Sequence, residues 1–337
     1  MDYNELQKPF FVLAPMDDVT DTVFRNIVDS CAPADLYFTE FVNVDGLQSP
    51  GRPKLLKKLQ FTANETRLVA QLWGLKPENF KKTAEEIADG TFARELGLPE
   101  GVNFVGVDLN MGCPAKSEVQ NGACSALIKN RPLAHEIIEA TREGLAGRLP
   151  LSVKTRVGFN EVDMTWIEFL LEHKLNMLTV HGRTRKQMSK VPADWSLIGR
   201  AREMRDALKL DTLIVGNGDV ESRAHGEALA AQYGLDGVMV GRGVFHDPYL
   251  FAPASPWEHK TREERIQLYA KHVQQFAETW QDNQRPVHTL NKFCKIYIQS
   301  FDGAKELREK LMAAPDAASL LLMLEHALTD SQKPAVQ

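Results

Sequence analysis

A cysteine that could donate a proton lies in the segment 108–114 (DLNMGCP), between Gly112 and Pro114 and directly after an apolar run. Glycine and proline on either side indicate a tight turn, which places the Cys113 thiol at the end of a predicted strand. An unperturbed thiol has a pKa of about 8.5, so at neutral pH most of it is protonated and can serve as a general acid. The alternative is a buried packing residue, because free cysteine mostly behaves as a small hydrophobic residue.

Polar side chains that could hold a polar cofactor follow the other strand-like runs. They are Gln71, Lys154, His181, Arg183, Asn217 and Arg242. Two glycine-containing segments, 216–219 (GNGD) and 241–243 (GRG), end the last two runs. Glycine lets backbone N–H groups approach a phosphate, and Arg242 adds positive charge. Each segment alone could be a simple turn, but their place after the seventh and eighth of eight runs predicts a phosphate-binding site.

Eight short apolar runs position these residues, and each is followed by a longer stretch with helical periodicity. The predicted strands are 11–16, 36–41, 68–74, 104–110, 151–156, 177–181, 213–217 and 237–241. The alternation predicts parallel strands joined by right-handed crossovers, and eight such units close a (β/α)8 TIM barrel. A doubly wound open sheet is the alternative. The polar residues at the carboxyl end of nearly every run favour the barrel, because barrel enzymes build their sites there.

The chain is predicted to form two domains. The strand pattern stops near residue 255, and apolar residues then recur at the three- and four-residue spacing of amphipathic helices. The proline-rich stretch 248–256 (PYLFAPASP) is the expected hinge, because proline discourages continuation of a helix. Residues 1–252 are therefore predicted to form the catalytic barrel and residues 253–337 a helical domain.

The composition is typical of a globular protein, with 43% hydrophobic and 25% charged residues. No apolar run approaches the roughly 20 residues that a membrane-spanning helix needs, and the N-terminus does not resemble a secretory signal. We therefore expect a soluble, cytoplasmic protein without a membrane partner, and nothing implies a stable protein partner. The four cysteines are too scattered for a zinc site or a disulfide scaffold, so we expect reduced thiols and no metal.

The net charge of −5 argues against a nucleic-acid partner when it is averaged over the whole chain. Residues 285–310 nevertheless carry a local excess of three positive charges, with Tyr297 and Phe301 interleaved. The basic residues in this stretch are Arg285, Lys292, Lys295, Lys305, Arg308 and Lys310. A run of this kind is more often a solvated helix face, and the alternative is a surface that docks RNA.

A set of motifs resembles those of the tRNA-dihydrouridine synthase family and occurs in the family's order. The motifs are APMDDVTD (14–21), TEF (39–41), VAQLWG (69–74), GVDLNMGCPAK (106–116), SVKTRVG (152–158), VHGRTR (180–185), ADW (193–195), GNGD (216–219) and DGVMVGRG (236–243). The similarity runs from about residue 11 to residue 251 and continues more weakly through 291–311, which is similar to the family's helical RNA-docking domain. DLNMGCPAK followed by SALI (125–128) is the most specific signal, since other FMN barrels share parts of the rest.

The resemblance implies reduction of the C5–C6 double bond of a uridine in the D-loop of tRNA, with FMN as cofactor and NADPH as reductant. Cys113 matches the family's acid. Residue-by-residue comparison implies cofactor contacts at Pro15, Met16, Asp17, Gln71, Lys154, His181, Asn217, Gly218, Asp219, Gly241 and Arg242. Substrate contacts are predicted for Asn110, Arg156, Arg183, Lys292 and Lys295.

Several alternatives remain open. The amide of Asn110 suits a uracil edge, but the same side chain could cap a local turn. Cys124 stands where the family commonly has glycine or another small residue, and the loop 186–191 (KQMSKV) lacks a glycine–tyrosine element that often precedes ADW. The segments 39–48 and 287–298 are slightly more similar to the bacterial C-type enzymes than to other members of the family. The alternative functions are an FMN-barrel ene-reductase acting on a small substrate, and a non-catalytic RNA-binding protein on a barrel scaffold.

Overall fold

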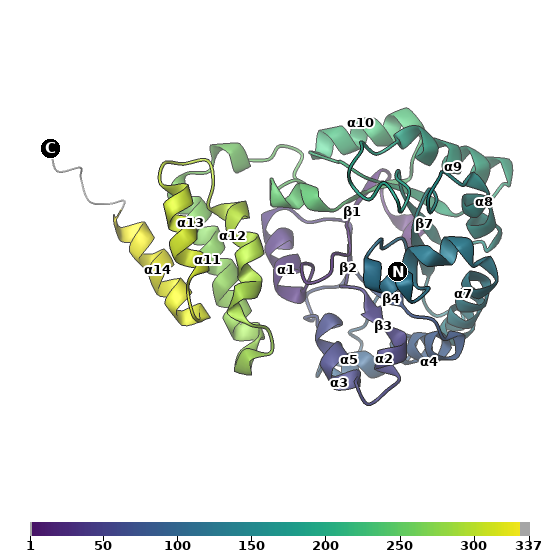
Figure 1. Ribbon diagram of the computed structural model, residues 1–337, viewed down its shortest axis with the longest axis horizontal. Coiled ribbons are helices and arrows are strands. Elements are labelled where there is room, and N and C mark those ends of the chain that lie inside the picture. Colours follow the sequence, from purple (N-terminus) through teal and green to yellow (C-terminus); the bar gives the residue numbers. More distant parts are fainter. Residues whose placement is uncertain (1, 331–337) are drawn as a thin grey trace. The chain divides into compact units, whose positions relative to one another are not determined.

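The structure, a computed structural model, describes residues 2–330. Residue 1 of the predicted barrel domain and residues 331–337 of the predicted helical domain lie outside the described residues. Eight parallel strands form a closed ring (Figure 1). They are β1 (Phe10–Leu13), β2 (Leu36–Phe38), β4 (Leu68–Trp73), β5 (Gly106–Met111), β6 (Leu151–Arg156), β7 (Met177–His181), β8 (Leu213–Asn217) and β9 (Gly237–Val240). The ring closes because β1 pairs with β9 and with β2, and β2 pairs with β4. The predicted (β/α)8 barrel is therefore confirmed.

A further strand that the sequence does not predict, β3 (Val42–Asn43), pairs with the carboxyl end of β4. Helices on the outside of the ring connect the strands (Figure 1). They are α2 (Val44–Leu47), α3 (Arg52–Leu55), α4 (Pro77–Ala88), α5 (Thr91–Glu95), α6 (Lys116–Gln120), α7 (Arg131–Leu145), α8 (Met164–Glu172), α9 (Trp195–Ala207) and α10 (Arg223–Tyr233). The side chains of Asn130, Asp163, Asp194 and Ser222 cap α7 to α10, each accepting a hydrogen bond from a backbone N–H of the first turn.

The inside of the barrel is apolar toward the amino ends of the strands and polar toward their carboxyl ends. Because successive side chains of a strand point to opposite faces, every second residue points inward. The inward apolar residues form one buried cluster with Tyr3, and this cluster includes Phe10, Val12, Leu36, Phe38, Val69, Met177, Leu213, Val215 and Met239. The inward positions that follow along β4 to β8 carry Gln71, Asn110, Lys154, His181 and Asn217, so strand alternation alone gathers the predicted site residues.

Among the described residues, a second compact unit comprises residues 23–33 and 242–330, and the barrel unit comprises the others. Its helices are α1 (Thr22–Cys31), which begins at the unit's border, α11 (Arg262–Thr279), α12 (Asn291–Tyr297), α13 (Ala304–Met312) and α14 (Ala317–Asp330). The Phe24 ring stacks on the Phe293 ring with centroids 4.9 Å apart, which ties α1 to α12. The division between the two compact units thus falls between residues 241 and 242, and α1 belongs to the helical unit. The roles predicted for residues 1–252 and 253–337 stay predictions.

No helix within residues 2–330 combines the length and the apolar character needed to cross a membrane.

Candidate active site

The loop that carries Cys113 follows β5 and is fixed from two sides. The Asn110 Oδ1 accepts hydrogen bonds from the backbone N–H groups of Gly112 at 3.1 Å and Cys113 at 2.9 Å. The Arg156 Nε donates to the Gly112 carbonyl at 2.8 Å. Glycine is favoured at 112, because a Cβ there would lie in a tight contact, 3.2 Å from backbone atoms of Thr155. The Cys113 side chain is half-buried at the barrel's carboxyl end.

The second cysteine, Cys124, belongs to the same site. Its thiol forms a hydrogen bond with the Cys113 sulfur, and the Ser125 N–H donates to the Cys113 carbonyl at 3.3 Å. This hydrogen bond lowers the pKa of Cys113 below its usual range, against the effect of burial, and raises that of the fully buried Cys124. Cys124 has a φ of 53°, a left-handed conformation that favours glycine. The family resemblance implies a small residue at this position, but the sequence does not show that the cysteine contacts Cys113.

A buried chain of hydrogen bonds supports the cysteine loop from within the barrel. The Ser152 Oγ donates to Asp108 Oδ1 at 2.6 Å, and the Gln71 Nε2 donates to Asp108 Oδ2 at 2.7 Å. The Asn110 Nδ2 donates to Gln71 Oε1 at 3.3 Å. Burial raises the pKa of Asp108 to about 6. Sequence reasoning missed Asp108, although a carboxylate two residues before Asn110 in an apolar strand is a visible signal.

Lys154 places a cation inside the barrel, where its hydrogen-bond partner is a neutral amide. Its Nζ donates to Asn217 Oδ1 at 3.1 Å, and the Asn217 Nδ2 donates to the Met239 carbonyl at 2.8 Å. Burial, and then the charge of Arg156, lower the pKa of Lys154 to about 8. The Thr179 residue lies beside Lys154 in the β6–β7 register, and its buried hydroxyl has no hydrogen-bond partner among the described residues. An anionic or polar ligand at this point would meet a cation and a free hydroxyl.

The two predicted substrate-binding arginines of the barrel are buried and hold loops. Arg156 Nη1 donates to the carbonyls of Thr184 at 3.2 Å and Met188 at 3.0 Å. Arg183 donates from Nε to the Val191 carbonyl at 2.6 Å and forms an ion pair with Asp219. Arg183 Nη1 also lies 3.1 Å from His181 Nε2. The loops after β6, β7 and β8 are therefore bound to one another.

The predicted phosphate segment after β8 contains a position that only glycine fits. Gly218 has a φ of 133°, and a Cβ there would lie 2.5 Å from the Ala193 Cβ. The Trp195 Nε1 donates to the Gly218 carbonyl at 3.0 Å, which fixes the segment against α9. At Gly241 an added Cβ would meet only Ala14 and Met16, at 3.7 and 3.9 Å, so the backbone there is open to a neighbour. Phosphate binding at these segments stays a prediction.

The cofactor-binding residues predicted after β1 differ in their exposure. Pro15 and Met16 are half-buried, and the Met16 N–H donates to Thr20 Oγ1 at 2.9 Å. Asp17 is exposed and pairs with Lys58, so its carboxylate is already engaged.

Three predicted residues belong to the helical unit and are described within it. Arg242 begins a short 3-10 helix, and Lys292 and Lys295 are exposed on α12, one turn apart. Two other members of the predicted docking stretch are not on the surface. Arg285 is buried over the Trp280 ring, and Tyr297 is fully buried in a stack with Tyr269. The expectation that Tyr297 is interleaved on an RNA-binding surface is therefore wrong, because its apolar ring completes the core of the unit.

The fold and this arrangement define a class: a (β/α)8 barrel with a half-buried cysteine of lowered pKa and buried charges at the carboxyl ends of its strands, where barrel enzymes carry their sites. Histamine dehydrogenase from Rhizobium sp. 4-9 shares the fold with a TM-score of 0.50 and 12% identity, covering 78% of this chain and 48% of that chain. A 2-naphthoyl-CoA reductase in complex with 2-naphthoyl-CoA matches with a TM-score of 0.53 and 13% identity, covering 74% and 50%. The chain spans about half the length of both structures.

The sequence profile described as "Dihydrouridine synthase (Dus)" matches residues 12–333. A probable tRNA-dihydrouridine synthase of Staphylococcus aureus (strain COL) is 41% identical over 326 residues, covering 96% of this chain and 94% of the relative. A probable tRNA-dihydrouridine synthase 2 of Bacillus subtilis (strain 168) is also 41% identical, covering 96% and 95%. The chain belongs to the dihydrouridine synthase family. The resemblance seen in its motifs is confirmed, and the C-type assignment stays a prediction.

Proposed function

We propose that this oxidoreductase reduces the C5–C6 double bond of a uridine in the D-loop of tRNA, with FMN as cofactor, NADPH as reductant and Cys113 as proton donor. Family membership supports the reaction. The observation that carries the assignment of residues is the position of the Cys113 thiol, which is held at the end of β5 close enough to Lys154 for their charges to interact.

The residues at the carboxyl ends of the strands fit a flavin nucleotide. Lys154 hydrogen-bonds to an amide oxygen. Burial lowers the pKa of Lys154, and the attraction of the Asp108 carboxylate does not offset this effect. An additional anionic group beside Lys154 would therefore be favoured. A cation beside a flavin ring stabilises its reduced, anionic form. We assign Pro15, Met16, Asp17, Gln71, Lys154, His181, Asn217, Gly218, Asp219, Gly241 and Arg242 to the cofactor. Most of these residues also have protein partners; Asp17, Gln71 and Asp219, for example, orient their neighbours as well.

When bound, reduced FMN supplies the hydride for C6 of the uracil ring. Cys113 supplies the proton for C5, and its sulfur is left as a thiolate. The Cys124 thiol and the Ala115 backbone N–H both hydrogen-bond to that sulfur and stabilise its negative charge. The loop bonds from Asn110 and Arg156 keep the sulfur in place while the proton leaves.

The substrate base has to leave its stack to enter the barrel mouth. Extrusion of a base costs a few kcal/mol, and less where the tertiary structure of tRNA already exposes it. We propose that Asn110, Arg156 and Arg183 contact the uridine or its phosphate. They would do so through the side-chain N–H groups that are not used in the hydrogen bonds to the loops. The exposed pair Lys292 and Lys295 would bind the tRNA backbone.

The test is mass spectrometry of tRNA treated with the purified protein, FMN and NADPH. We expect a gain of two hydrogens at a D-loop uridine. The tRNA assignment would be overturned if treated and untreated tRNA had the same mass while the protein reduced a small enone with NADPH. That result would favour a small-molecule reductase. Identical masses without any NADPH oxidation would favour a non-catalytic RNA-binding protein.

A further inference from the structure

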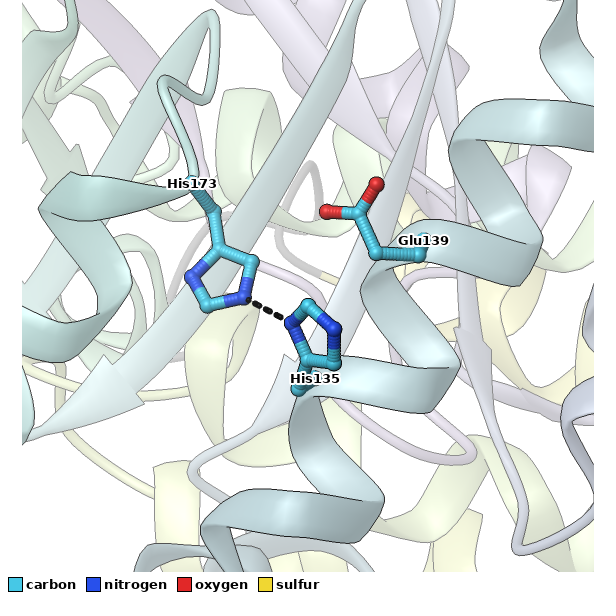
Figure 2. Close-up of side chains that lie close together, drawn as sticks. All are labelled: His135, Glu139 and His173. Atoms are coloured by element: carbon cyan, nitrogen blue, oxygen red, sulfur yellow. Dashed lines mark hydrogen bonds between the residues drawn. The ribbon is translucent and has the colours of Figure 1, made fainter.

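Three side chains with metal-binding groups meet on the outside of the barrel, between α7 and α8. His135 and Glu139 lie one turn apart on α7, and His173 is the C-cap residue of α8 (Figure 2). One ligand atom from each lies within 4.8 Å of the other two. The sequence predicts no metal site, because the second histidine follows the first by 38 residues and only the packing of the two helices joins them.

The hydrogen bonds fix which nitrogen of His173 is available. His173 Nδ1 lies 2.8 Å from the Phe169 carbonyl oxygen, and since a carbonyl can only accept, Nδ1 carries the proton. The Nε2 of the neutral ring therefore presents a lone pair. The Phe169 ring packs edge-on against the imidazole with centroids 4.7 Å apart, which holds the ring in this orientation. A ligating histidine whose other nitrogen donates to a carbonyl is the usual arrangement in protein metal sites.

The lone pair of His173 is aimed at the second histidine. His173 Nε2 lies 3.0 Å from His135 Nδ1, so that without a metal one proton is shared between the two nitrogens (Figure 2). Two nitrogens bound to one zinc ion at about 2.0–2.1 Å in tetrahedral geometry lie about 3.3–3.4 Å apart. A metal ion can therefore replace this proton if the nitrogens move apart by a few tenths of an ångström and the rings turn so that both lone pairs point at the ion, while His135 moves its proton to Nε2.

Glu139 supplies the third ligand and the negative charge. Its carboxylate pairs with Arg142 three residues further along α7, and both side chains are about two-fifths exposed, at 43% and 40%. An ion pair this exposed contributes about 0–1 kcal/mol, so a dication can compete for the carboxylate at small cost. Glu172 lines the same groove, so that the groove's two carboxylates offset the positive charges of Arg142 and Lys174 beside the site.

We propose that His135, Glu139 and His173 bind a divalent transition metal ion of the zinc class, with water as the fourth ligand. Two imidazoles and one carboxylate suit such ions, whereas magnesium and calcium prefer oxygen ligands alone. Because the ligands come from two helices, the ion joins the C-terminal end of α8 to α7. It stabilises the outer layer of the barrel and takes no part in the proposed reduction, so the proposal is independent of the proposed function.

The test is titration of chelator-treated full-length protein with Zn2+, by calorimetry, and with Co2+, by visible absorption. We expect one ion per chain, a Co2+ spectrum of tetrahedral type, and a melting temperature that rises with the concentration of Zn2+. His135→Ala and His173→Ala should each weaken binding at least tenfold, and Glu139→Gln by less. His326→Ala, which removes an exposed histidine from α14, is the matched control and should bind as the parent does.

His135 is exposed, so its replacement should leave the fold intact even if the His173 variant unfolds. The proposal is overturned if the parent protein binds no ion at one per chain, or if the His135 variant binds Zn2+ as tightly as the parent and the His326 variant.

Discussion

The sulfur of Cys113 is assigned acid chemistry near neutral pH, and its surroundings bring its pKa into that range. The hydrogen bond from Cys124 lowers the pKa of Cys113 to about 7 against the opposing effect of burial. A general acid works best when its pKa lies near the working pH, because a protonated population and a favourable proton transfer then coexist. Only the thiol form can donate, so we expect the rate of uridine reduction to be highest below the pKa of Cys113 and to fall as the pH rises through it.

Replacement of Cys124 by alanine tests this tuning. Loss of a hydrogen bond to a charged sulfur, about 1.5 kcal/mol, corresponds to a rise of about one unit in the pKa of Cys113. The alkaline limb of the pH–rate profile should therefore move to higher pH, and the thiolate absorbance of Cys113 should titrate with it. Alanine tolerates the left-handed backbone at 124 no worse than cysteine does. Cys31→Ala, in the helical unit, should leave both curves unchanged; a Cys124 variant with the parent's curves would contradict the role.

At the residue scale the sequence could predict the side chains whose place follows from strand alternation. Cys113, Lys154 and Asn217 each come at the end of an apolar run, and the barrel brings these ends together. Turn capping by Asn110, which the sequence offered as an alternative to uracil binding, is what the structure shows. The sequence could not show that Cys124 contacts Cys113, because that contact depends on how the loop folds back over the strand end.

At the scale of elements, α7 packs so closely on α4 that one position must be glycine. A Cβ at Gly144 would lie 2.1 Å from the Lys81 carbonyl oxygen and 3.1 Å from the Ala84 Cβ. Gly144→Ala should lower the free energy of unfolding by about 1–3 kcal/mol or more, because backbone atoms of α4 have to move. The neighbouring Glu143→Ala removes a solvent-exposed ion pair with Lys81 and should leave the free energy of unfolding almost unchanged. Urea midpoints measure both, and equal midpoints would show that the helices separate easily.

The elements also show where sequence periodicity stops being informative. The eight runs predict the ring of strands because each run is long enough to show its pattern. The two residues of β3 are too few for any period. The apolar face of α1 is visible in the sequence, but periodicity does not tell which core receives it, and Phe24 packs on Phe293 near the other end of the chain.

At the scale of the whole molecule, recognition of tRNA is assigned to the helical unit in spite of the negative net charge. Replacing Lys292 and Lys295 together by alanine should weaken tRNA binding and reduce its dependence on salt. The slope of the logarithm of the binding constant against the logarithm of the salt concentration should fall by about one unit for each phosphate that is no longer neutralised. Lys174→Ala with Lys209→Ala is the matched control, because these exposed lysines precede β7 and β8 at the amino ends of the strands, opposite the site. Fluorescence anisotropy at several salt concentrations measures the slopes, and equal slopes in both double variants would place the docking surface elsewhere.

The most direct measurement compares Cys113→Ala with the parent protein in single-turnover reduction of tRNA, with the flavin of each protein reduced beforehand and the product mapped by mass spectrometry. Removal of a general acid costs about 100-fold or more in rate. We expect the variant to bind flavin and tRNA as the parent does and to form dihydrouridine at least about 100 times more slowly. A variant that forms dihydrouridine at the parent's rate would contradict the assignment of Cys113 as the proton donor.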